Sequence, residues 1–131
     1  MTQHPIEIIL LRQWAEHMAI PIWIMDASGD LVYYNEPAEA ILGVRFDEAG
    51  VIQADDLAEL FVTTALDGSP LTSEDLPVVV ALHKQVPDHR PLQIKSFDGS
   101  WRRIDVTAFP LEAQGGRFLG AVACFWESSD R

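Results

Sequence analysis

The sequence contains a single cysteine, Cys124, among its 131 residues. A disulfide within one chain is therefore excluded, and we expect a reducing, cytoplasmic environment. No apolar run approaches the roughly 20 residues that are needed to span a bilayer. The residues that follow Met1 carry no basic cluster ahead of an apolar stretch, so we expect no signal peptide and no membrane association.

Basic residues are also scarce. Nine lysines and arginines stand against 20 aspartates and glutamates, which gives a net charge of −11. Only Arg102 and Arg103 are adjacent, so there is no basic patch along the chain. A charge of this sign repels phosphate backbones and anionic lipid, and we therefore expect no nucleic-acid partner.

Motifs for catalysis and metal binding are missing as well. There is no Gly-x-Ser-x-Gly elbow and no glycine-rich phosphate loop. The acidic pairs Asp55-Asp56 and Glu74-Asp75 are sequence neighbours, which do not share a helix face, so capping and solvation explain them better than acid–base chemistry. No histidine pairs with another histidine, a cysteine or a carboxylate at metal-ligand spacing. We expect neither an enzyme nor a metal site.

The chain does contain enough apolar residues to form one core. Hydrophobic residues make up 48% of the sequence and charged residues 22%, which is typical of a single globular domain. A helix is predicted over residues 6–18, where four large apolar residues recur at helical spacing: Ile6, Leu10, Trp14 and Met18. Pro21 prevents this helix from continuing, and a helix so apolar needs a surface to pack on.

A tight hairpin is predicted next, with strands near residues 22–25 and 31–34. Asp26 and Gly29 suit its turn, because aspartate bonds to its own backbone and glycine accepts a positive φ. Asn35 is then predicted to cap a helix that Gly43 ends.

The remaining segments predict further helices and then three strands. One helix is expected to start at Asp55-Asp56 and to carry Leu66, and another to run from Ser73 to Lys84. Strands near residues 92–97, 101–109 and 118–126 follow, separated by the turn signals Asp98-Gly99 and Gly115-Gly116. This order of elements predicts an α+β domain with one antiparallel sheet of five strands.

Taken together, several segments resemble the PAS (Per-Arnt-Sim) family. They are the hairpin from Ile22 to Asn35, Ile41-Leu42-Gly43, Asp67-Gly68-Ser69-Pro70-Leu71, Leu76-Pro77, Ala81-Leu82, Phe97-Asp98-Gly99, Pro110-Leu111, and Gly116 through Val122. The resemblance covers residues 20–127 and lies in the order and spacing of the pieces. It implies a five-stranded antiparallel sheet with helices on one face and a small pocket between them. It also implies a sensory or partner-binding role in bacterial-type signalling.

On this interpretation the chain divides into three parts. Residues 1–19 form an N-terminal amphipathic flanking helix for dimerisation or capping, residues 20–127 the PAS-like domain, and residues 128–131 a tail.

Cofactor-binding branches of the family set the expectation for cofactors. The flavin-binding light-oxygen-voltage branch places its reactive cysteine in an Asn-Cys-Arg-Phe-Leu-Gln helix, whereas Cys124 falls in the last strand, where we expect a buried, inert thiol. Haem-binding relatives use a histidine on a helix. His83 is the one helix histidine in the matching half, and it follows the end of the apolar stripe, so we expect it to be exposed. We therefore expect neither haem nor flavin.

Two sets of residues are candidates for binding. The set expected to face the helices and to line the core or a ligand pocket consists of Ile24, Leu60, Leu76, Val79, Val80, Leu92, Ile94, Ile104, Val106, Ala108, Ala121, Ala123 and Phe125. The inward side of the last strand is taken from the family's pattern, in which Phe125 looks inward. The set expected to form a dimer interface between the helix and the outer sheet face consists of Ile6, Ile9, Leu10, Leu11, Trp14, Met18, Val122, Cys124 and Trp126.

Two functions remain open at this point. The favoured one is a cytoplasmic sensory signal-transduction domain that forms a homodimer, binds a small apolar ligand and acts on a signalling partner or output domain. The alternative is a ligand-free protein–protein interaction module whose core is filled by its own side chains. For the dimer, the N-terminal helix has more apolar surface than one sheet can cover, although it could instead fold onto its own sheet.

Overall fold

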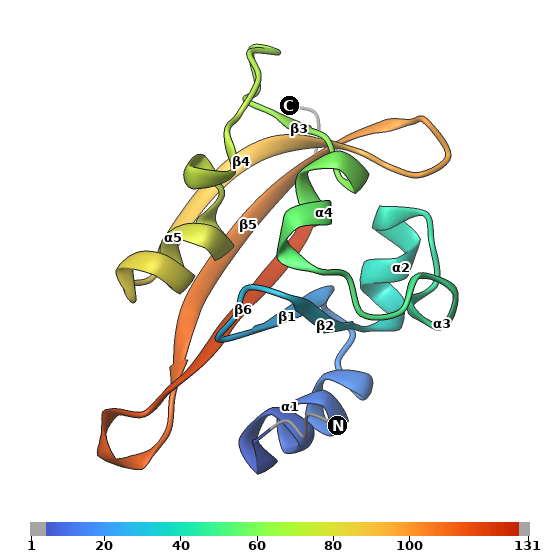
Figure 1. Ribbon diagram of the computed structural model, residues 1–131. Helices are drawn as coiled ribbons and strands as arrows, with labels where there is room; N and C mark the ends of the chain where they lie inside the picture. Colours follow the sequence, from blue (N-terminus) through green and yellow to red (C-terminus); the bar gives the residue numbers. More distant parts are fainter. Residues whose placement is uncertain (1–4, 129–131) are drawn as a thin grey trace.

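The computed structural model describes residues 5–128 and consists of one antiparallel sheet with helices on both of its faces (Figure 1). The strands, in chain order, are β1 (Ile22–Asp26), β2 (Leu31–Tyr34), β3 (Thr63–Thr64), β4 (Asp88–Lys95), β5 (Trp101–Glu112) and β6 (Phe118–Glu127). Their spatial order is β2-β1-β6-β5-β4-β3. Residues 1–4 and 129–131, which include His4 and nearly all of the expected tail, lie outside the described residues.

The helices are short. They are α1 (Ile6–Glu16), α2 (Glu36–Leu42), α3 (Phe46–Ala49), α4 (Ala54–Leu60) and α5 (Pro77–Lys84), with 3₁₀ turns at Ser73–Asp75 and Gln114–Gly116. Within residues 5–128, none of them has the length and apolar character that a membrane crossing requires.

The predicted α+β class is confirmed, but the sheet has six strands instead of five. The extra strand, β3, has only two residues, and Thr63 pairs with Ile94 of β4. Strand β4 also begins at Asp88, four positions before the predicted start at Leu92, despite Pro91. Proline is tolerated there because β4 pairs with β3 only at Gln93 and Ile94, so the rest of that edge needs no N–H donor.

Three predicted helix boundaries were wrong. Helix α1 ends at Glu16, and α4 ends at Leu60, so neither reaches the predicted Met18 or Leu66. The segment from Ser73 is a 3₁₀ turn, and α5 begins only at Pro77, because proline lacks an N–H and fits the first turn of a helix.

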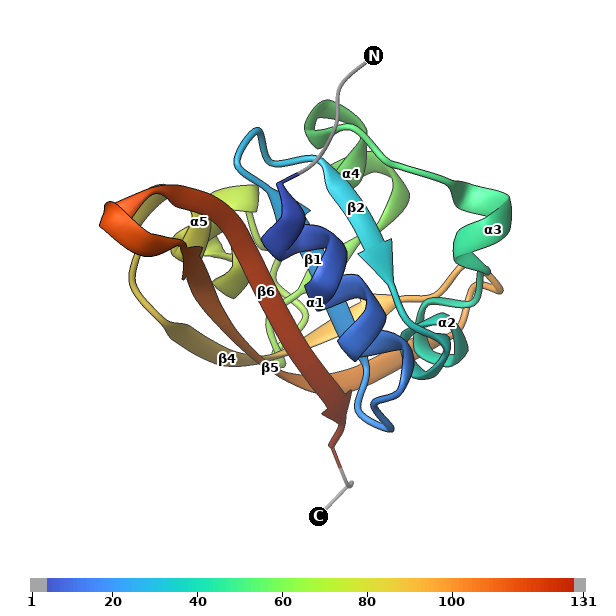
Figure 2. The same ribbon diagram turned by 90° about the horizontal axis from the view of Figure 1, so that it is seen from below.

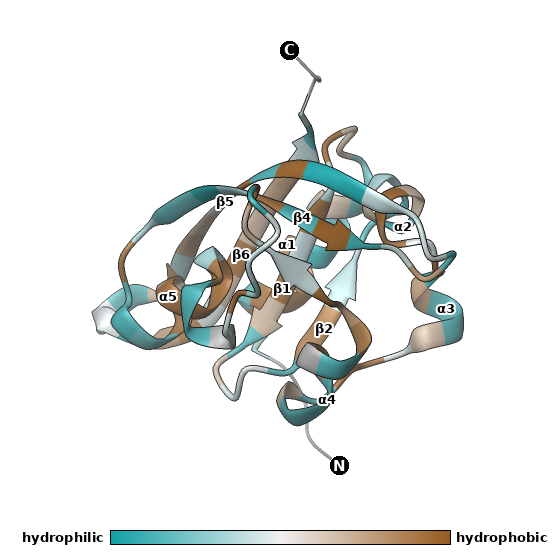
Figure 3. Cartoon of the chain, turned by 90° about the horizontal axis from the view of Figure 1, so that it is seen from above, coloured by the Kyte–Doolittle hydropathy of each residue, from teal (hydrophilic) through white to brown (hydrophobic). Residues whose placement is uncertain are grey.

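The two faces of the sheet carry separate apolar clusters. Helices α2, α4 and α5 pack on the inner face, where Ala121, Ala123 and Phe125 of β6 are buried. Helix α1 packs on the outer face, and its Ile8 belongs to the same cluster as Val122 of β6 (Figure 2). Hydrophobic residues on α5 and along β1 and β6 mark the centre of the fold (Figure 3). Strands β1 and β6 are therefore covered on both faces.

The side chain of Asn35 connects the two layers. The predicted cap is confirmed, since Asn35 Oδ1 accepts a hydrogen bond from Ala38 N at 3.2 Å, and the same oxygen accepts one from Ile22 N at 2.9 Å. Its Nδ2 donates to Ala15 O at 3.0 Å and to Ile20 O at 2.9 Å. Asn35 is fully buried and uses both donors and both acceptor positions of its amide. One side chain thus holds the end of α1, the start of β1 and the start of α2.

Two further contacts hold α1 on the sheet. Near its N-terminus, Glu7 forms an ion pair of 2.7 Å with Arg117 of the β5–β6 hairpin; the Arg117 side chain is exposed and Glu7 is partly buried. Near its middle, the Arg12 guanidinium lies 4.7 Å from the Tyr33 ring centroid and 5.7 Å from that of Phe46, which are cation–π distances. Helix α1 is therefore attached along its whole length.

Gly120 allows β1 and β6 to approach each other closely. Its φ of +145° lies outside the range that other residues usually adopt, and a Cβ here would overlap the carbonyl oxygen of Met25. The same atom would come within 2.9 Å of Asp26 Cα, which is backbone and cannot rotate away.

We predict that Gly120→Ala lowers the free energy of unfolding by about 3 kcal/mol or more, measured by urea denaturation, because it forces β1 away from β6. Gly115→Ala is the matched control: Gly115 has a φ of +79° but open space around its Cβ position. The control should lose only about 1 to 2 kcal/mol, the usual cost of a left-handed non-glycine residue. Equal losses in the two variants would contradict the close contact.

We also predict that Asn35→Ala costs about 3 kcal/mol, more than the roughly 1 kcal/mol of an ordinary helix cap, because buried donors and acceptors lose their partner. Asn35→Asp separates the two roles, since it keeps both acceptor bonds and loses the two donor bonds to Ala15 and Ile20. At neutral pH it should also be destabilised. Wild-type stability of Asn35→Asp in the same urea titration would mean that the bonds to the end of α1 contribute nothing.

Candidate ligand-binding pocket

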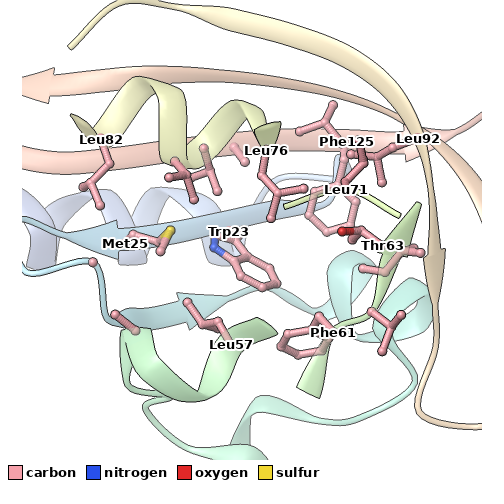
Figure 4. A pocket seen from close by; sticks show the side chains of 18 of the residues that line it. Trp23, Met25, Leu57, Phe61, Thr63, Leu71, Leu76, Leu82, Leu92 and Phe125 are labelled. Carbon is pink, nitrogen blue, oxygen red and sulfur yellow. The ribbon is translucent and has the colours of Figure 1, made fainter. Parts of the chain in front are cut away.

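A cavity of about 480 Å³ lies between the inner sheet face and the helices α4 and α5 (Figure 4). The central strands supply its floor through Trp23, Ala123 and Val106. Helix α5 and the segment before it supply one wall, while Leu57 and Phe61 at α4 supply the other. The volume falls within the range of small-molecule sites.

Many of the predicted inward-facing residues line this cavity. They are Leu76, Val79, Leu92, Ile94, Ile104, Val106, Ala123 and Phe125. Ala108 and Ala121 are buried in the inner core without reaching the cavity. The inward side that was chosen for β6 therefore agrees with the structure.

The inward placement of Ile24 was wrong. Ile24 is opposite Val122 on β6, and Trp23 is opposite Ala123. Opposite residues of an antiparallel pair share a face, so Ile24 lies on the outer face with α1, and Trp23 faces the pocket. Both faces of β1 are apolar, which is why the sequence alone did not distinguish them.

The two remaining misplacements lie on helices. Leu60 is 40% exposed, because the pocket-facing stripe of its segment runs through Leu57 and Phe61, four residues apart. Val80 is half-buried but does not line the pocket, which Val79 does.

Several pocket residues were not predicted to line it: Trp23, Met25, Leu57, Phe61, Leu71, Val78 and Leu82. Among them, Trp23 and Phe61 form an aromatic group with a neighbour on β2. The Trp23 ring centroid lies 6.3 Å from that of Tyr34, stacked, and 5.2 Å from that of Phe61, edge-on. Burial raises the pKa of Tyr34 to about 12, and its hydroxyl donates to Val44 O at 3.0 Å. The register of β1 against β6 would have identified Trp23.

The electrostatic character of the pocket is close to neutral. Among its described lining residues there is no lysine or arginine, and the ionisable ones are Asp55 and His83. His83 is exposed, as predicted, and its Nδ1 lies 3.5 Å from Glu74 Oε2. No group of three or more potential metal ligands occurs among residues 5–128. The cavity is therefore suited to an uncharged, mostly apolar molecule.

Comparisons with known proteins resolve the fold. No family model matches the sequence, and no curated protein matches it either. Solved structures do match: the PAS domain of BvgS from Bordetella pertussis is 15% identical over 95% of this chain and 88% of its own, with a TM-score of 0.63. A PAS domain from Colwellia psychrerythraea is 18% identical over 95% of this chain and 99% of its own, with a TM-score of 0.66. The chain has the PAS fold.

A light-oxygen-voltage (LOV) protein from Rhodobacter sphaeroides has the same fold at 9% identity. The match covers 95% of this chain and 69% of that one, with a TM-score of 0.71. In the present PAS fold the single cysteine, Cys124, lies on the outer face next to the α1 cluster and does not line the pocket. Burial raises the pKa of its thiol, so the thiolate that would react is disfavoured.

In this PAS fold, some of the predicted dimer-interface residues pack between α1 and the sheet, and the others are exposed. Val122 is buried beneath the chain's own α1, so the open outer face that was predicted at this position is not present. Leu11, Met18 and Cys124 pack, partly buried, against the same cluster, and Ile9 is half-buried. The remaining members are exposed: Ile6 by 64%, Leu10 by 56%, Trp14 by 49% and Trp126 by 46%.

Proposed function

We propose that this PAS-fold domain is a sensory signalling module that binds a small, mainly apolar ligand in the pocket between α4, α5 and the sheet. The observation that carries the proposal is the cavity of about 480 Å³ with apolar walls. A mainly apolar cavity of this size forfeits packing contacts unless a ligand fills it. The alternative, an interaction module with a self-filled core, requires side chains to occupy that space.

Ligand binding would act through the sheet and through Asn35. A ligand contacts Trp23 on the inner face of β1, while its neighbours Ile22 and Ile24 pack under α1 on the outer face. A ligand shifts a conformational equilibrium only if it binds one arrangement better. Here the two arrangements would differ in how closely α4 and α5 pack on the sheet, and α1 would pass the difference to a partner or output domain.

We propose that the occupant is neither haem nor flavin. Haem carries two carboxylates and flavin nucleotides carry phosphate, and no lysine or arginine among the described lining residues would neutralise them. His83 is exposed and close to Glu74, and Cys124 lies on the other face of the sheet. The proposal assigns the pocket no catalytic role.

We further propose that two copies of the domain associate through α1. Ile6, Leu10 and Trp14 are spaced four residues apart and so form one stripe along the helix. All three are large, apolar and about half or more exposed. A stripe on one helix can pair with itself about a two-fold axis, the usual symmetry of homodimers.

Ligand binding is tested with indane, an uncharged bicyclic hydrocarbon. We expect indane to raise the melting temperature of the wild type, and Val79→Trp to weaken its binding about tenfold, or about 1.4 kcal/mol, because the indole occupies the cavity. Val80→Trp is the control, since Val80 is half-buried on the same helix but does not line the pocket. Native mass spectrometry and visible absorption of the purified protein identify any bound molecule. No bound molecule and no response to indane would support the interaction module instead.

The dimer is tested with Leu10→Glu, which places a charge in the middle of the exposed stripe. We expect sedimentation of the wild type at tens of micromolar to show a dimer and that of the variant a monomer, with little loss of stability because Leu10 is 56% exposed. Gln13→Glu adds the same charge at an exposed polar position of α1 and should remain dimeric. A monomeric wild type would refute the proposal, and a dimeric Leu10→Glu would locate the interface elsewhere.

A further inference from the structure

The indole nitrogen of Trp23 is a buried donor without an acceptor. Trp23 lines the pocket, and its Nε1 has no hydrogen-bond partner among the described residues while being closed to solvent. Leaving a buried donor unsatisfied costs about 1 to 3 kcal/mol. Such groups are rare in native proteins, and each needs a physical reason.

The described residues around this nitrogen provide neither an aromatic nor a polar acceptor. Figure 4 shows the nitrogen edge of the indole turned away from Phe61 and toward the end of the pocket where Met25 lies. The edge-on contact with Phe61 is therefore not an N–H···π bond. The hydrophobic side chains of Met25, Leu57 and Leu82 line the pocket, and none of them carries a strong acceptor for this N–H group.

We infer that the pocket selects uncharged, mainly apolar molecules that carry one hydrogen-bond acceptor, such as a ketone oxygen, and that this acceptor binds Trp23 Nε1. The inference rests on the proposed ligand-binding function. The long, flexible side chain of Met25 rotates to admit the acceptor. The absence of lysine and arginine from the described lining and the presence of Asp55 disfavour anionic acceptors. An apolar ligand that fills the pocket brings this acceptor with it.

The hydroxyl of Thr63 gives the pocket a second polar end. Thr63 lines the cavity on the opposite side from Met25, and its hydroxyl forms no hydrogen bond within the described part of the chain (Figure 4). Between these two ends the lining is almost entirely apolar. The pocket therefore distinguishes ligands by where a polar atom sits on an apolar frame.

A matched pair of probes tests the inference: indane and 1-indanone, which have nearly the same shape and differ by a carbonyl oxygen. Calorimetry gives the ratio of their dissociation constants. We expect Trp23→Phe to reduce the preference for 1-indanone by about 3- to 10-fold, the range of one net hydrogen bond. Both probes lose the same packing contacts when phenylalanine replaces the larger indole, so the ratio of their dissociation constants reports on the carbonyl oxygen alone. Trp101→Phe, at an exposed position away from the pocket, should leave the ratio unchanged.

A second measurement uses the wild type and does not require a variant that still binds the probes. In a ¹H–¹⁵N spectrum of the wild type, the indole N–H signal of Trp23, identified by its loss in Trp23→Phe, should move downfield with 1-indanone and not with indane. If both probes bind but Trp23→Phe leaves the ratio of dissociation constants unchanged and 1-indanone does not shift the indole signal, the hydrogen-bond inference is wrong. The proposed ligand-binding function would then still be supported. If neither probe binds, the proposed function and the inference both fail.

Discussion

The four hydrogen bonds of Asn35 are the interaction on which the rest of the structure depends. They hold α1, β1 and α2 at one point, and these elements belong to opposite layers of the domain. Only an amide can form this set at this size: a carboxylate lacks the donors and leucine lacks both kinds of group. The outer helix α1 and the inner helix α2 are therefore positioned relative to the same strand, β1, which also contributes Trp23 to the floor of the pocket.

The second constraint is that β1 and β6 are apolar on both faces. Trp23 and Ile24 are adjacent residues that serve different clusters, the first at the pocket and the second under α1. The only charged residues of these two strands, Asp26 of β1 and Glu127 of β6, stand at the strand ends. This is why a chain with a net charge of −11 has a pocket lined almost wholly by neutral groups.

Local chemistry allowed part of this structure to be predicted. The β1–β2 turn and the Asn35 cap depend on residues close in sequence, and both were predicted correctly. The errors arose where distant segments decide. Ile24 was assigned to the wrong face because only pairing with Val122 distinguishes two apolar faces. Leu60 was misplaced because a seven-residue helix gives too few turns to define its buried stripe. Strand β3 was missed because two residues show no alternation.

The two ends of α1 are attached by interactions of different physical kinds. At the C-terminal end, the bond from Asn35 to Ala15 is buried and independent of salt. At the N-terminal end, the Glu7–Arg117 ion pair is exposed, so dissolved ions screen it. Helix α1 is thus fixed at its C-terminal end and held by a salt-sensitive contact at its N-terminal end. Ionic strength therefore changes how strongly the N-terminal end of α1 binds the β5–β6 hairpin, while the C-terminal end keeps its position.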